Sequence, residues 1–381
     1  MDFELTEEMK MLKDMAYKFA VAEFTPISHE CDKYEKYTPE IVKKAAENGL
    51  VGAWVPEKYG GAGVGILGNA IVTEELSRVD MGIGINIMSA TFGLEAIYYF
   101  GTEEQKKTYI TPVCKGEKVC AGAFTEPDAG TDVAGYRTRA VKDGKDYIIT
   151  GTKMFITNGT VCDFYIAQCI TNPEAEKKHS RFSQIIVPAD AKGVTRNKIP
   201  GKMGIRSSDT AEVSFEEVRV PQTNLVGKEG AGFQQLMHFF DVTRVLVGAQ
   251  GVGISQGCLD KTLQYVKERK AFGVPIGTYQ LSMAKLTEMA IRIELLRTLV
   301  YKTAWLIDIG KPDYTLSAMI KYYGGQTAVY CANAAVELHG GYGYIDEYAV
   351  QKYYRDAKVL EIYEGSKEAE TMTIGRVLLS K

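Results

Sequence analysis

The sequence predicts an α+β protein of three domains, with helical domains at both ends and an antiparallel β-barrel or sandwich between them. Apolar residues recur at three- and four-residue steps from Thr6 to about Lys118 and alternate in twos from about Val119 to Leu225. The helical period returns from Gly230 onward. A length of 381 residues allows two or three domains. We therefore expect domains at residues 1–118, 119–225 and 226–381.

The first domain should consist of helices joined by glycine-rich turns. Met9, Leu12, Met15 and Phe19 form one apolar face, and Thr6 is a suitable N-cap for their helix. Further helices are predicted at Pro39–Asn48, Gly68–Ser77, Gly84–Phe100 and Glu103–Val113. No signal or transit segment precedes the first helix, which favours a cytoplasmic protein.

The middle domain should consist of short strands, because its alternating stretches are bounded by Gly, Asn, Asp or Pro. Strands are predicted at Tyr147–Thr150, Lys153–Thr157, Phe164–Ile170, Phe182–Val187 and Ala211–Val220. No helical pattern separates them, so we expect an antiparallel arrangement rather than a parallel α/β sheet.

Long helices are predicted in the last domain. They cover Phe233–Glu268, with a break near Gly251–Gly257, then Thr278–Ile309, Thr315–Glu337, Asp346–Arg355 and a final helix after Gly365.

Composition excludes several classes of function. The net charge is −3 and no basic tract is present, so nucleic acid is not an expected partner. The charge-free stretches contain polar residues and glycine, so no membrane span is expected. The seven cysteines are scattered and form no C-x-x-C pair, which favours reduced thiols. The four histidines lack metal-binding spacing, so we expect no metal site.

One carboxylate stands out near the C-terminus. Glu364 lies between Tyr363 and Gly365, and apolar surroundings would raise its pKa toward the range useful for proton transfer. Taken alone, a solvated glutamate at a helix start is the more ordinary interpretation.

The polar loop Ala121–Asp132 offers backbone N–H groups freed by glycine, which suit an anionic or heteroaromatic ligand, although it lacks the known phosphate-binding patterns. Phe155 and Thr157 place a flat ring beside a hydroxyl on one side of a strand end. An ordinary entry loop and a hairpin corner at Asn158-Gly159 are the alternatives.

Two basic or glycine-rich helix ends are also candidates. Arg269–Gly273 either complements a helix dipole or contacts a phosphate. Glu337–Tyr344 stops a helix and permits close approach of a ligand to the backbone.

Taken in order, these segments resemble the acyl-CoA dehydrogenase family of flavoproteins, essentially from end to end. The resemblance rests on six motifs: Thr125–Asp132, Phe155–Gly159, Met203–Ser208, Glu268–Gly273, Gly340–Gly343 and Ile362–Ser366. It implies a C-terminal four-helix bundle, a homotetramer, and FAD between the middle and C-terminal domains.

The resemblance also implies the cofactor site. Residues expected to hold the flavin are Gly122, Ala123, Phe124, Thr125, Gly130, Thr131, Phe155, Ile156 and Thr157, with Thr157 near N5 and Thr125 near the pyrimidine edge. A neighbouring subunit would supply Arg269, Phe272, Gln280, Glu337, Gly340 and Gly341, and Ser366 and Glu368 would complete the site. Phe155 stands where many members of the family have Trp, and Glu337 stands where many have Gln. We expect that Glu368 likewise replaces an amide.

Substrate positions follow in the same way. Thr131, Asp241, Thr243, Arg244 and Gly365 match positions at the CoA or the thioester, and Glu364 matches the catalytic base. The family has a second base position before the arginine; here it holds Thr243, which leaves Glu364 as the single base.

The implied reaction is α,β-dehydrogenation of an acyl-CoA to the 2-enoyl-CoA. Glu364 would take the α-proton while the β-hydride passes to flavin N5, and an electron-transferring flavoprotein would accept the electrons. Alternatives are an enoyl-CoA reductase working in reverse, a glutaryl-type dehydrogenase, and a silent scaffold that binds acyl-CoA and flavin. An acyl-CoA oxidase and a flavin monooxygenase fit less well, because of the chain length and of Glu364 respectively.

The acyl pocket is expected along Gly84–Phe100, including Ser89, Thr91, Phe92 and Glu95. No Lys or Arg lies between Met81 and Phe100, whereas a dicarboxylic acyl group would need a cation there. A small neutral acyl group is therefore predicted, either a cyclohexane-carboxyl-type ring or a short straight chain. The bacterial cytoplasm is the expected location.

Overall fold

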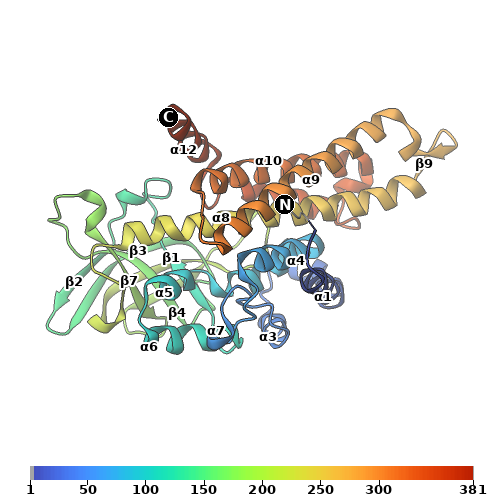
Figure 1. The fold of residues 1–381 in the computed structure, drawn as a ribbon. Helices are drawn as coiled ribbons and strands as arrows, with labels where there is room; N and C mark the ends of the chain where they lie inside the picture. Colours follow the sequence, from blue (N-terminus) through green and yellow to red (C-terminus); the bar gives the residue numbers. More distant parts are fainter. Residues whose placement is uncertain (1–3, 381) are drawn as a thin grey trace.

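A computed structural model describes residues 4–380 and has helical, β-sheet and helical parts in that order (Figure 1). The N-terminal part contains α1 (Glu7–Phe24), α2 (Ser28–Lys33), α3 (Pro39–Glu47), α4 (Gly65–Met88), α5 (Leu94–Phe100), α6 (Glu103–Gln105) and α7 (Thr111–Cys114). The predicted cap of α1 is confirmed, since the Thr6 hydroxyl accepts a hydrogen bond from the Met9 N–H at 3.2 Å. None of the described helices is both long and apolar enough to cross a membrane.

The predicted helix Gly84–Phe100 is wrong in its middle. Helix α4 bends at Asp80 and ends at Met88, and a tight 3-10 turn at Ser89–Thr91 leads into α5. Gly93, with φ of +103°, makes the turn that starts α5, a conformation that disfavours side chains. The break turns Ser89 and Phe92 toward the middle part, where the Ser89 carbonyl accepts from Asn158 and the Phe92 ring lies 6.3 Å from Phe124.

An eight-stranded sheet forms the middle part, which lies at one end of the molecule in Figure 1. Its strands are β1 (Cys120–Ala123), β2 (Arg139–Asp143), β3 (Asp146–Thr157), β4 (Phe164–Ile170), β5 (Phe182–Pro188), β6 (Val194–Lys198), β7 (Thr210–Pro221) and β8 (Leu225–Val226). The boundary predicted at residue 225 falls inside β8.

The sheet is not closed into a barrel, so that part of the prediction is wrong. The strand order is β6-β7-β3-β2-β4-β5-β8, and β1 pairs with β4. Within the described chain β6 pairs only with β7 and β8 only with β5, which leaves two ends that never meet. The pairing is antiparallel except that β4 runs parallel to β1 and β2.

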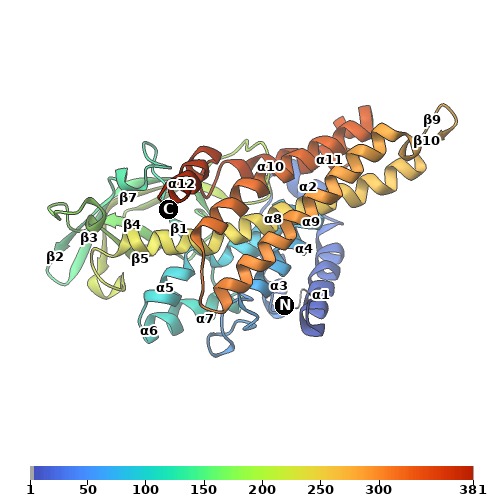
Figure 2. The same ribbon diagram turned by 45° about the horizontal axis from the view of Figure 1, so that its top comes forward.

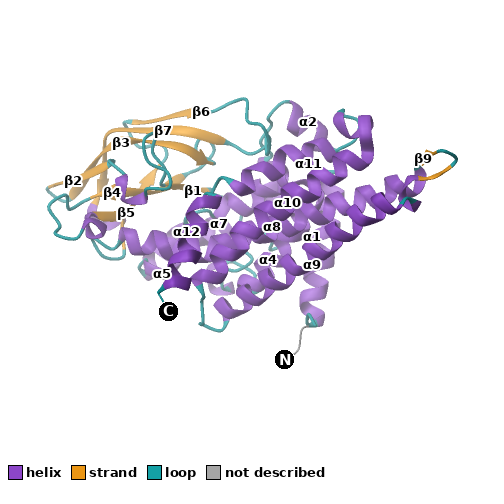
Figure 3. Cartoon of the chain, turned by 90° about the horizontal axis from the view of Figure 1, so that it is seen from above, coloured by secondary structure: helices purple, strands orange, loops and turns teal. Residues whose placement is uncertain are grey.

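Three long helices dominate the C-terminal part: α8 (Gly232–Glu268), α9 (Gln280–Asp308) and α10 (Tyr314–His339). The shorter α11 (Val350–Ala357) and α12 (Lys367–Leu379) lie against α10, and β9 (Lys270–Ala271) and β10 (Val274–Pro275) form a hairpin between α8 and α9 (Figure 2). Seen from above, the helices form one continuous body beside the sheet (Figure 3).

The break predicted in α8 near Gly251–Gly257 is also wrong, because α8 runs unbroken for 37 residues. Its glycines serve close helix packing. A Cβ added at Gly253 would lie 2.2 Å from the Glu74 carbonyl oxygen, and one at Gly257 would lie 2.2 Å from that of Arg78. Helix α4 can approach α8 this closely only where side chains are missing.

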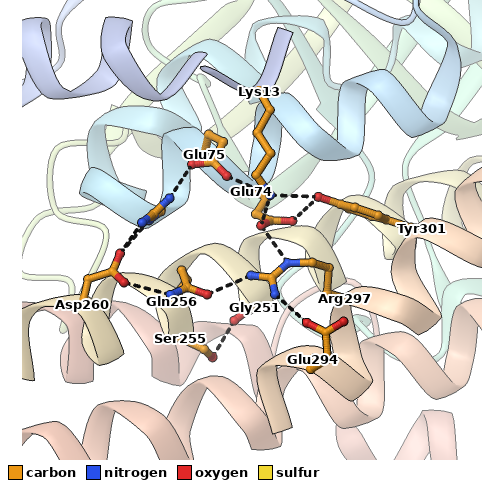
Figure 4. A network of polar contacts seen from close by, with 11 residues as sticks. Lys13, Glu74, Glu75, Gly251, Ser255, Gln256, Asp260, Glu294, Arg297 and Tyr301 are labelled. Carbon is orange, nitrogen blue, oxygen red and sulfur yellow. Dashed lines mark hydrogen bonds and ion pairs between the residues drawn. The ribbon is translucent and has the colours of Figure 1, made fainter. Parts of the chain in front are cut away.

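A buried polar network joins these helices (Figure 4). Glu74 of α4 has a fully buried side chain and accepts hydrogen bonds from Lys13 of α1 at 3.0 Å, Arg297 of α9 at 3.0 Å and Tyr301 at 2.7 Å. Arg78 pairs with Asp260 of α8 at 2.6 Å. The network therefore fixes the N-terminal helices to the C-terminal ones through charges that are matched.

Candidate active site

The loop Ile362–Ser366 holds Glu364 in an unusual backbone conformation. Glu364 has φ of +58° and Gly365 has φ of +110°, both in the left-handed region. This conformation costs a residue with a side chain about 1 kcal/mol or more, and such strain gathers at functional sites. The loop ends at Ser366, whose hydroxyl caps α12 by accepting from the Ala369 N–H at 3.3 Å.

Two neighbouring residues of α8 fix Glu364. The Thr243 hydroxyl donates to Oε2 of Glu364 at 2.5 Å, and Nε of Arg244 donates to the Glu364 backbone carbonyl at 3.1 Å. Burial raises the pKa of Glu364 to about 7, although the Thr243 hydrogen bond and the charges of Arg244 and Lys321 lower it. The carboxylate is thus poised near neutrality, where a general base works best.

The Thr243 hydroxyl suits both protonation states of Glu364. Its oxygen also lies 3.1 Å from the Phe239 backbone carbonyl. With Glu364 ionised, the single hydroxyl proton can go to the carboxylate; with Glu364 protonated, the hydroxyl accepts from Glu364 and donates to Phe239. Neither state leaves the carboxyl without a partner.

Asp241 and Arg244 lie on the same stretch of α8. Burial raises the pKa of Asp241 to about 6, and the Arg244 charge partly offsets this. The Arg244 guanidinium lies 5.3 Å from the centre of the Phe240 ring and 2.9 Å from a Glu370 carboxylate oxygen. The sequence-predicted residues Asp241, Thr243, Arg244, Glu364 and Gly365 are therefore brought together.

A buried ion pair supports the loop Ala121–Asp132. Lys153 of β3 is inaccessible to solvent and donates to Glu126 at 2.9 Å and to the Phe124 carbonyl at 3.1 Å. Glu126 also accepts from the N–H of Arg137 and from both the N–H and the hydroxyl of Thr138. Thr125 is joined to β3 through its carbonyl, which accepts from the Met154 N–H at 2.8 Å. The loop residues predicted from the sequence are therefore held by the Lys153–Glu126 ion pair and by hydrogen bonds to backbone groups.

A bulge in β3 exposes Phe155. The β3–β7 register shifts between Lys153 and Ile156, Phe155 takes φ of +59°, and 65% of its surface is exposed. Ile156 is buried, whereas Thr157 is half-buried on the same side of the strand as Phe155. An exposed ring beside a hydroxyl is thereby presented at the strand end.

Asn158 is a residue whose role sequence reasoning missed, beyond its turn chemistry. It is fully buried, and its side-chain amide donates to the Ser89 carbonyl at 2.8 Å. It therefore links the Phe155–Thr157 strand end to the turn before α5. The Asn-Gly pair was the available signal, but it also fits an ordinary hairpin.

An aromatic wall lies between the turn before α5 and α8. Phe92 lies 4.9 Å from Phe239 and 6.3 Å from Phe124, and Phe239 lies 5.2 Å from Phe124 and 5.5 Å from Phe240, all between ring centres. Phe239 is one turn before Thr243 on α8, so the wall stands close to Glu364. Four bulky rings therefore occupy the space beside Thr243.

The predicted pocket residues Ser89 and Thr91 are buried, and their hydroxyls donate to backbone carbonyls at 2.6 Å and 3.4 Å. Glu95 is also buried and accepts from the Gly93 N–H at 3.0 Å. Burial raises the pKa of Glu95 to about 8, so this carboxyl is largely uncharged at neutral pH.

Ser366 and Glu368 lie at the start of α12 beside the Glu364 loop, whereas a second group of predicted cofactor residues lies at the opposite end of the helices. Arg269, Glu337, Gly340 and Gly341 line a hollow of about 510 Å³ together with Tyr265, Ile276, Leu338, His339, Tyr342 and Ile345. Phe272 is 98% exposed at the tip of the β9–β10 hairpin, and Gln280 begins α9. Glu337 is paired with Lys285 and accepts from Asn333 at 3.0 Å, and the Lys285 hydrogen bond lowers its pKa.

This second group is far from the first. Helix α8 starts beside the middle part, where the Phe233 ring stacks on His179 of the turn before β5 at 3.9 Å between ring centres, and it ends at Glu268, directly before Arg269. Its 37 residues span about 55 Å, and Figures 1 and 2 show the hairpin and the sheet at opposite ends. One chain therefore does not bring the two sets of predicted cofactor residues together.

Family models for the N-terminal, middle and C-terminal domains of acyl-CoA dehydrogenase match residues 6–117, 121–218 and 230–379. The chain belongs to the acyl-CoA dehydrogenase family, whose members are oxidoreductases that act on CH–CH groups with FAD.

Named relatives cover the whole chain. It is 40% identical over 380 residues to the probable acyl-CoA dehydrogenase YngJ of Bacillus subtilis, with 100% of both chains covered. It is 39% identical to acryloyl-CoA reductase (NADH) of Anaerotignum propionicum, covering 100% of this chain and 97% of that one.

Solved structures agree closely. Butyryl-CoA dehydrogenase of Megasphaera elsdenii superposes with a TM-score of 0.96 at 37% identity, with both chains fully covered. A chain from work on the electron transferring flavoprotein of Acidaminococcus fermentans gives 0.96 at 40% identity, again over both full chains. The glutaryl-coenzyme A dehydrogenase complex with glutaryl-CoA gives 0.95 at 32% identity, covering 100% and 97%.

The residues present fit FAD. Gly130 is exposed with nothing within 4 Å of the position of a Cβ, which leaves backbone free for close approach. The exposed Phe155 ring offers a flat surface, and Thr157 a hydroxyl, on the same side of β3. Phe155, Thr157 and the supported loop would hold the ring system.

Proposed function

We propose that this protein catalyses α,β-dehydrogenation of a small neutral acyl-CoA to the 2-enoyl-CoA, with Glu364 as the base. The observation that carries the proposal is the Glu364 carboxyl, which burial and three weak compensations leave with a pKa of about 7. A base with this pKa is ionised in useful amounts at neutral pH and still binds a proton well.

Each neighbouring residue has a part in the proposed reaction. Glu364 takes the α-proton, and the Thr243 hydroxyl then accepts a hydrogen bond from the new carboxylic acid. The Glu364 N–H stabilises the charge that develops on the thioester oxygen. FAD, if held by Phe155, Thr157 and the loop Ala121–Asp132, would supply the acceptor for the β-hydride. Arg244 and Asp241 of α8 orient the part of the substrate that carries CoA.

The acyl group is proposed to be small and uncharged. Phe92, Phe239 and Phe124 surround the space beside Thr243 with rings, and α5 contributes the buried carboxyl of Glu95 and no cation. The free carboxylate of a glutaryl group would lie near the Glu95 carboxyl rather than near a cation. A cyclohexane-carboxyl-type ring and a short straight chain are the two candidates.

The reverse reaction is a second candidate function. The relative of Anaerotignum propionicum is named an acryloyl-CoA reductase (NADH), and the same base and flavin would serve both directions. A glutaryl-type substrate is supported only by the similar glutaryl-coenzyme A dehydrogenase fold. A silent scaffold is disfavoured, because Glu364 keeps its strained backbone and its partners.

We further propose a homotetramer in which a neighbouring subunit completes each FAD site. The length of α8 supports this. Phe124 of the flavin loop packs on Phe239, and the 30 residues from Phe239 to Arg269 place Arg269 about 45 Å away along the helix, with Phe272, Gln280 and Glu337 at the same end. An electron-transferring flavoprotein is the proposed electron acceptor, supported by the similar chain from Acidaminococcus fermentans. The bacterial cytoplasm is the proposed location; the seven cysteines, all free and buried, support a reducing compartment.

A panel of acyl-CoA thioesters tests the proposal through bleaching of the flavin absorbance. Cyclohexane-carboxyl-CoA or butyryl-CoA should bleach the wild-type holoenzyme, and glutaryl-CoA should not. Crotonyl-CoA with the reduced holoenzyme tests the opposite direction. Absence of flavin oxidation or reduction with all four thioesters would contradict the proposed function.

A further inference from the structure

A second carboxylate lies directly under the Glu364 loop. Glu370, on α12, has a fully buried side chain, and one of its oxygens lies 2.9 Å from Nη2 of Arg244. A Cβ added at Gly365 would lie 2.0 Å from this same oxygen. The loop residue next to Glu364 therefore rests on Glu370, and only a glycine fits there.

Arg244 connects the two glutamates. Its Nε donates to the Glu364 backbone carbonyl at 3.1 Å, while its Nη2 pairs with Glu370. The guanidinium fork thus bridges the backbone of the proposed base and a buried counter-charge. Without that counter-charge, a guanidinium this close to Glu364 would favour its ionised form more strongly.

The charge balance around Glu364 also depends on two buried groups that lack hydrogen-bond partners in the described part of the chain, Lys321 and Glu370. Lys321 of α10 is 1% exposed, and among the described residues neither its ammonium nor the Glu370 oxygens have a hydrogen-bond partner. Burial lowers the pKa of Lys321 to about 8 and raises that of Glu370. These groups act on each other through charge alone, so removing one changes the field at the others.

We propose that Glu370 is a positioning residue for the proposed base: it anchors Arg244 under the loop and cancels the positive charge of Arg244 beside Glu364. This inference rests on the proposed function of Glu364. Burial raises the pKa of Glu364 first, and the Glu370 charge raises it further, against Arg244 and Lys321.

Several charged groups around Glu364 act on it directly or through its neighbours. Helix α8 supplies Asp241 and Arg244, α10 supplies Lys321, and α12 supplies Glu370. Glu361, just before the loop, acts on Lys321, and Glu95 of α5 senses Glu364. Of the acidic groups, Glu370 is the one in direct contact with Arg244 and the loop.

The test is the pH dependence of the rate of flavin reduction by an acyl-CoA substrate in the holoenzyme. Glu370→Gln keeps the shape of the side chain and removes its charge, so the acid-side midpoint should fall by roughly one pH unit. Glu370→Asp keeps the charge and should retain most of the wild-type midpoint. Glu74→Gln, an equally buried and paired glutamate far from the loop, should lower stability and leave the midpoint unchanged.

An unchanged or raised midpoint in Glu370→Gln would overturn the proposal, as would an equal shift in Glu74→Gln. If Glu370→Gln does not fold, the comparison moves to an Arg244→Gln background, where the pair becomes two amides. Arg244→Gln should raise the midpoint, and adding Glu370→Gln should bring it back down. Identical midpoints in these two variants would also overturn the proposal.

A second measurement separates this inference from the proposed function. The carboxyl stretching band of Glu364, assigned by its loss in Glu364→Gln, can be titrated by infrared spectroscopy without turnover. A lower titration midpoint in Glu370→Gln supports the role of Glu370 even if no acyl-CoA is oxidised. An unchanged band midpoint contradicts it, whatever the substrate.

Discussion

Glu74 is fully buried and Glu364 is half-buried, yet their surroundings shift the pKa values of these two glutamates in opposite directions. Burial acts to raise the pKa of Glu74, but Arg297, Lys13 and Tyr301 together hold it below its ordinary value of 4.5. Burial raises the pKa of Glu364 to about 7, because one hydroxyl and two more weakly coupled cations compensate it only in part. Glu74 therefore stays ionised near neutral pH, whereas Glu364 can gain or lose a proton there.

The difference lies in how completely the partners satisfy the carboxylate. The Glu74 network joins α1, α4, α8 and α9 with matched ions (Figure 4). At the Glu364 loop, Arg244 is divided between a backbone carbonyl and Glu370. Full pairing gives stability to the first region, and incomplete pairing gives proton affinity to the second.

Removing the charge of Glu364 should have the largest effect on activity. Glu364→Gln should slow acyl-CoA dehydrogenation by about 100- to 10,000-fold, the usual contribution of a general base. The flavin spectrum and the thermal unfolding of the variant serve as controls and should show a folded holoenzyme. Retained turnover would place the base elsewhere.

Breaking the fixed pair should cost stability instead of activity. Arg297→Met leaves Glu74 buried without its main counter-charge and should lower the free energy of unfolding by about 3–5 kcal/mol. Urea unfolding with wild type and an exposed control, Glu8→Gln, measures this change. A loss below 1 kcal/mol would contradict the role given to the pair.

The two glutamates should also give stability opposite dependences on pH. The stabilising contribution of Glu74 is present above its ordinary pKa of 4.5 and is lost as pH falls through its lowered value. Glu364 has a raised pKa, so its charge destabilises the fold progressively between pH 4.5 and about 7. Glu364→Gln should therefore be more stable than wild type at pH 8, by roughly 1–3 kcal/mol, and equal to it at pH 4.5. Equal stability at both pH values would contradict this interpretation.

A smaller effect is expected at Thr243. Thr243→Val removes the donor to the Glu364 carboxylate and should raise the acid-side midpoint of flavin reduction by roughly one pH unit. The direction is opposite to that expected for Glu370→Gln. Thr262→Val, a buried hydroxyl that donates to its own helix, provides a matched control and should not move the midpoint.

Much of the architecture was accessible from the sequence. Periods of two and of three to four residues separate the sheet from the helices, and the cap at Thr6 follows from local chemistry. Local patterns failed where tertiary contacts decide: Gly253 and Gly257 allow helix crossing instead of breaking α8, and strand pairing leaves the sheet open.

The residues of the site also fall into two groups: those that motifs predict and those that only tertiary contacts reveal. Glu364, Thr243 and Arg244 were predicted through motifs, and the structure places them in contact. Glu370 and Lys321 carry no motif signal, because an acidic residue in a first helical turn and a lysine in a helix are ordinary. Only the packing of α12 and α10 against the loop reveals them. The hairpin residues Arg269 and Phe272 lie beyond the far end of α8, and only the proposed assembly would bring them to a flavin site.

The pH dependence of flavin reduction in single turnover tests the account most directly. Wild-type holoenzyme mixed with a short or cyclic acyl-CoA should reduce its flavin at a rate that rises through a midpoint near pH 7. Glu364→Gln should lack this rise and remain slow at every pH. A wild-type midpoint near 4.5, or rapid reduction in Glu364→Gln, would contradict the claim that incomplete pairing makes Glu364 the base.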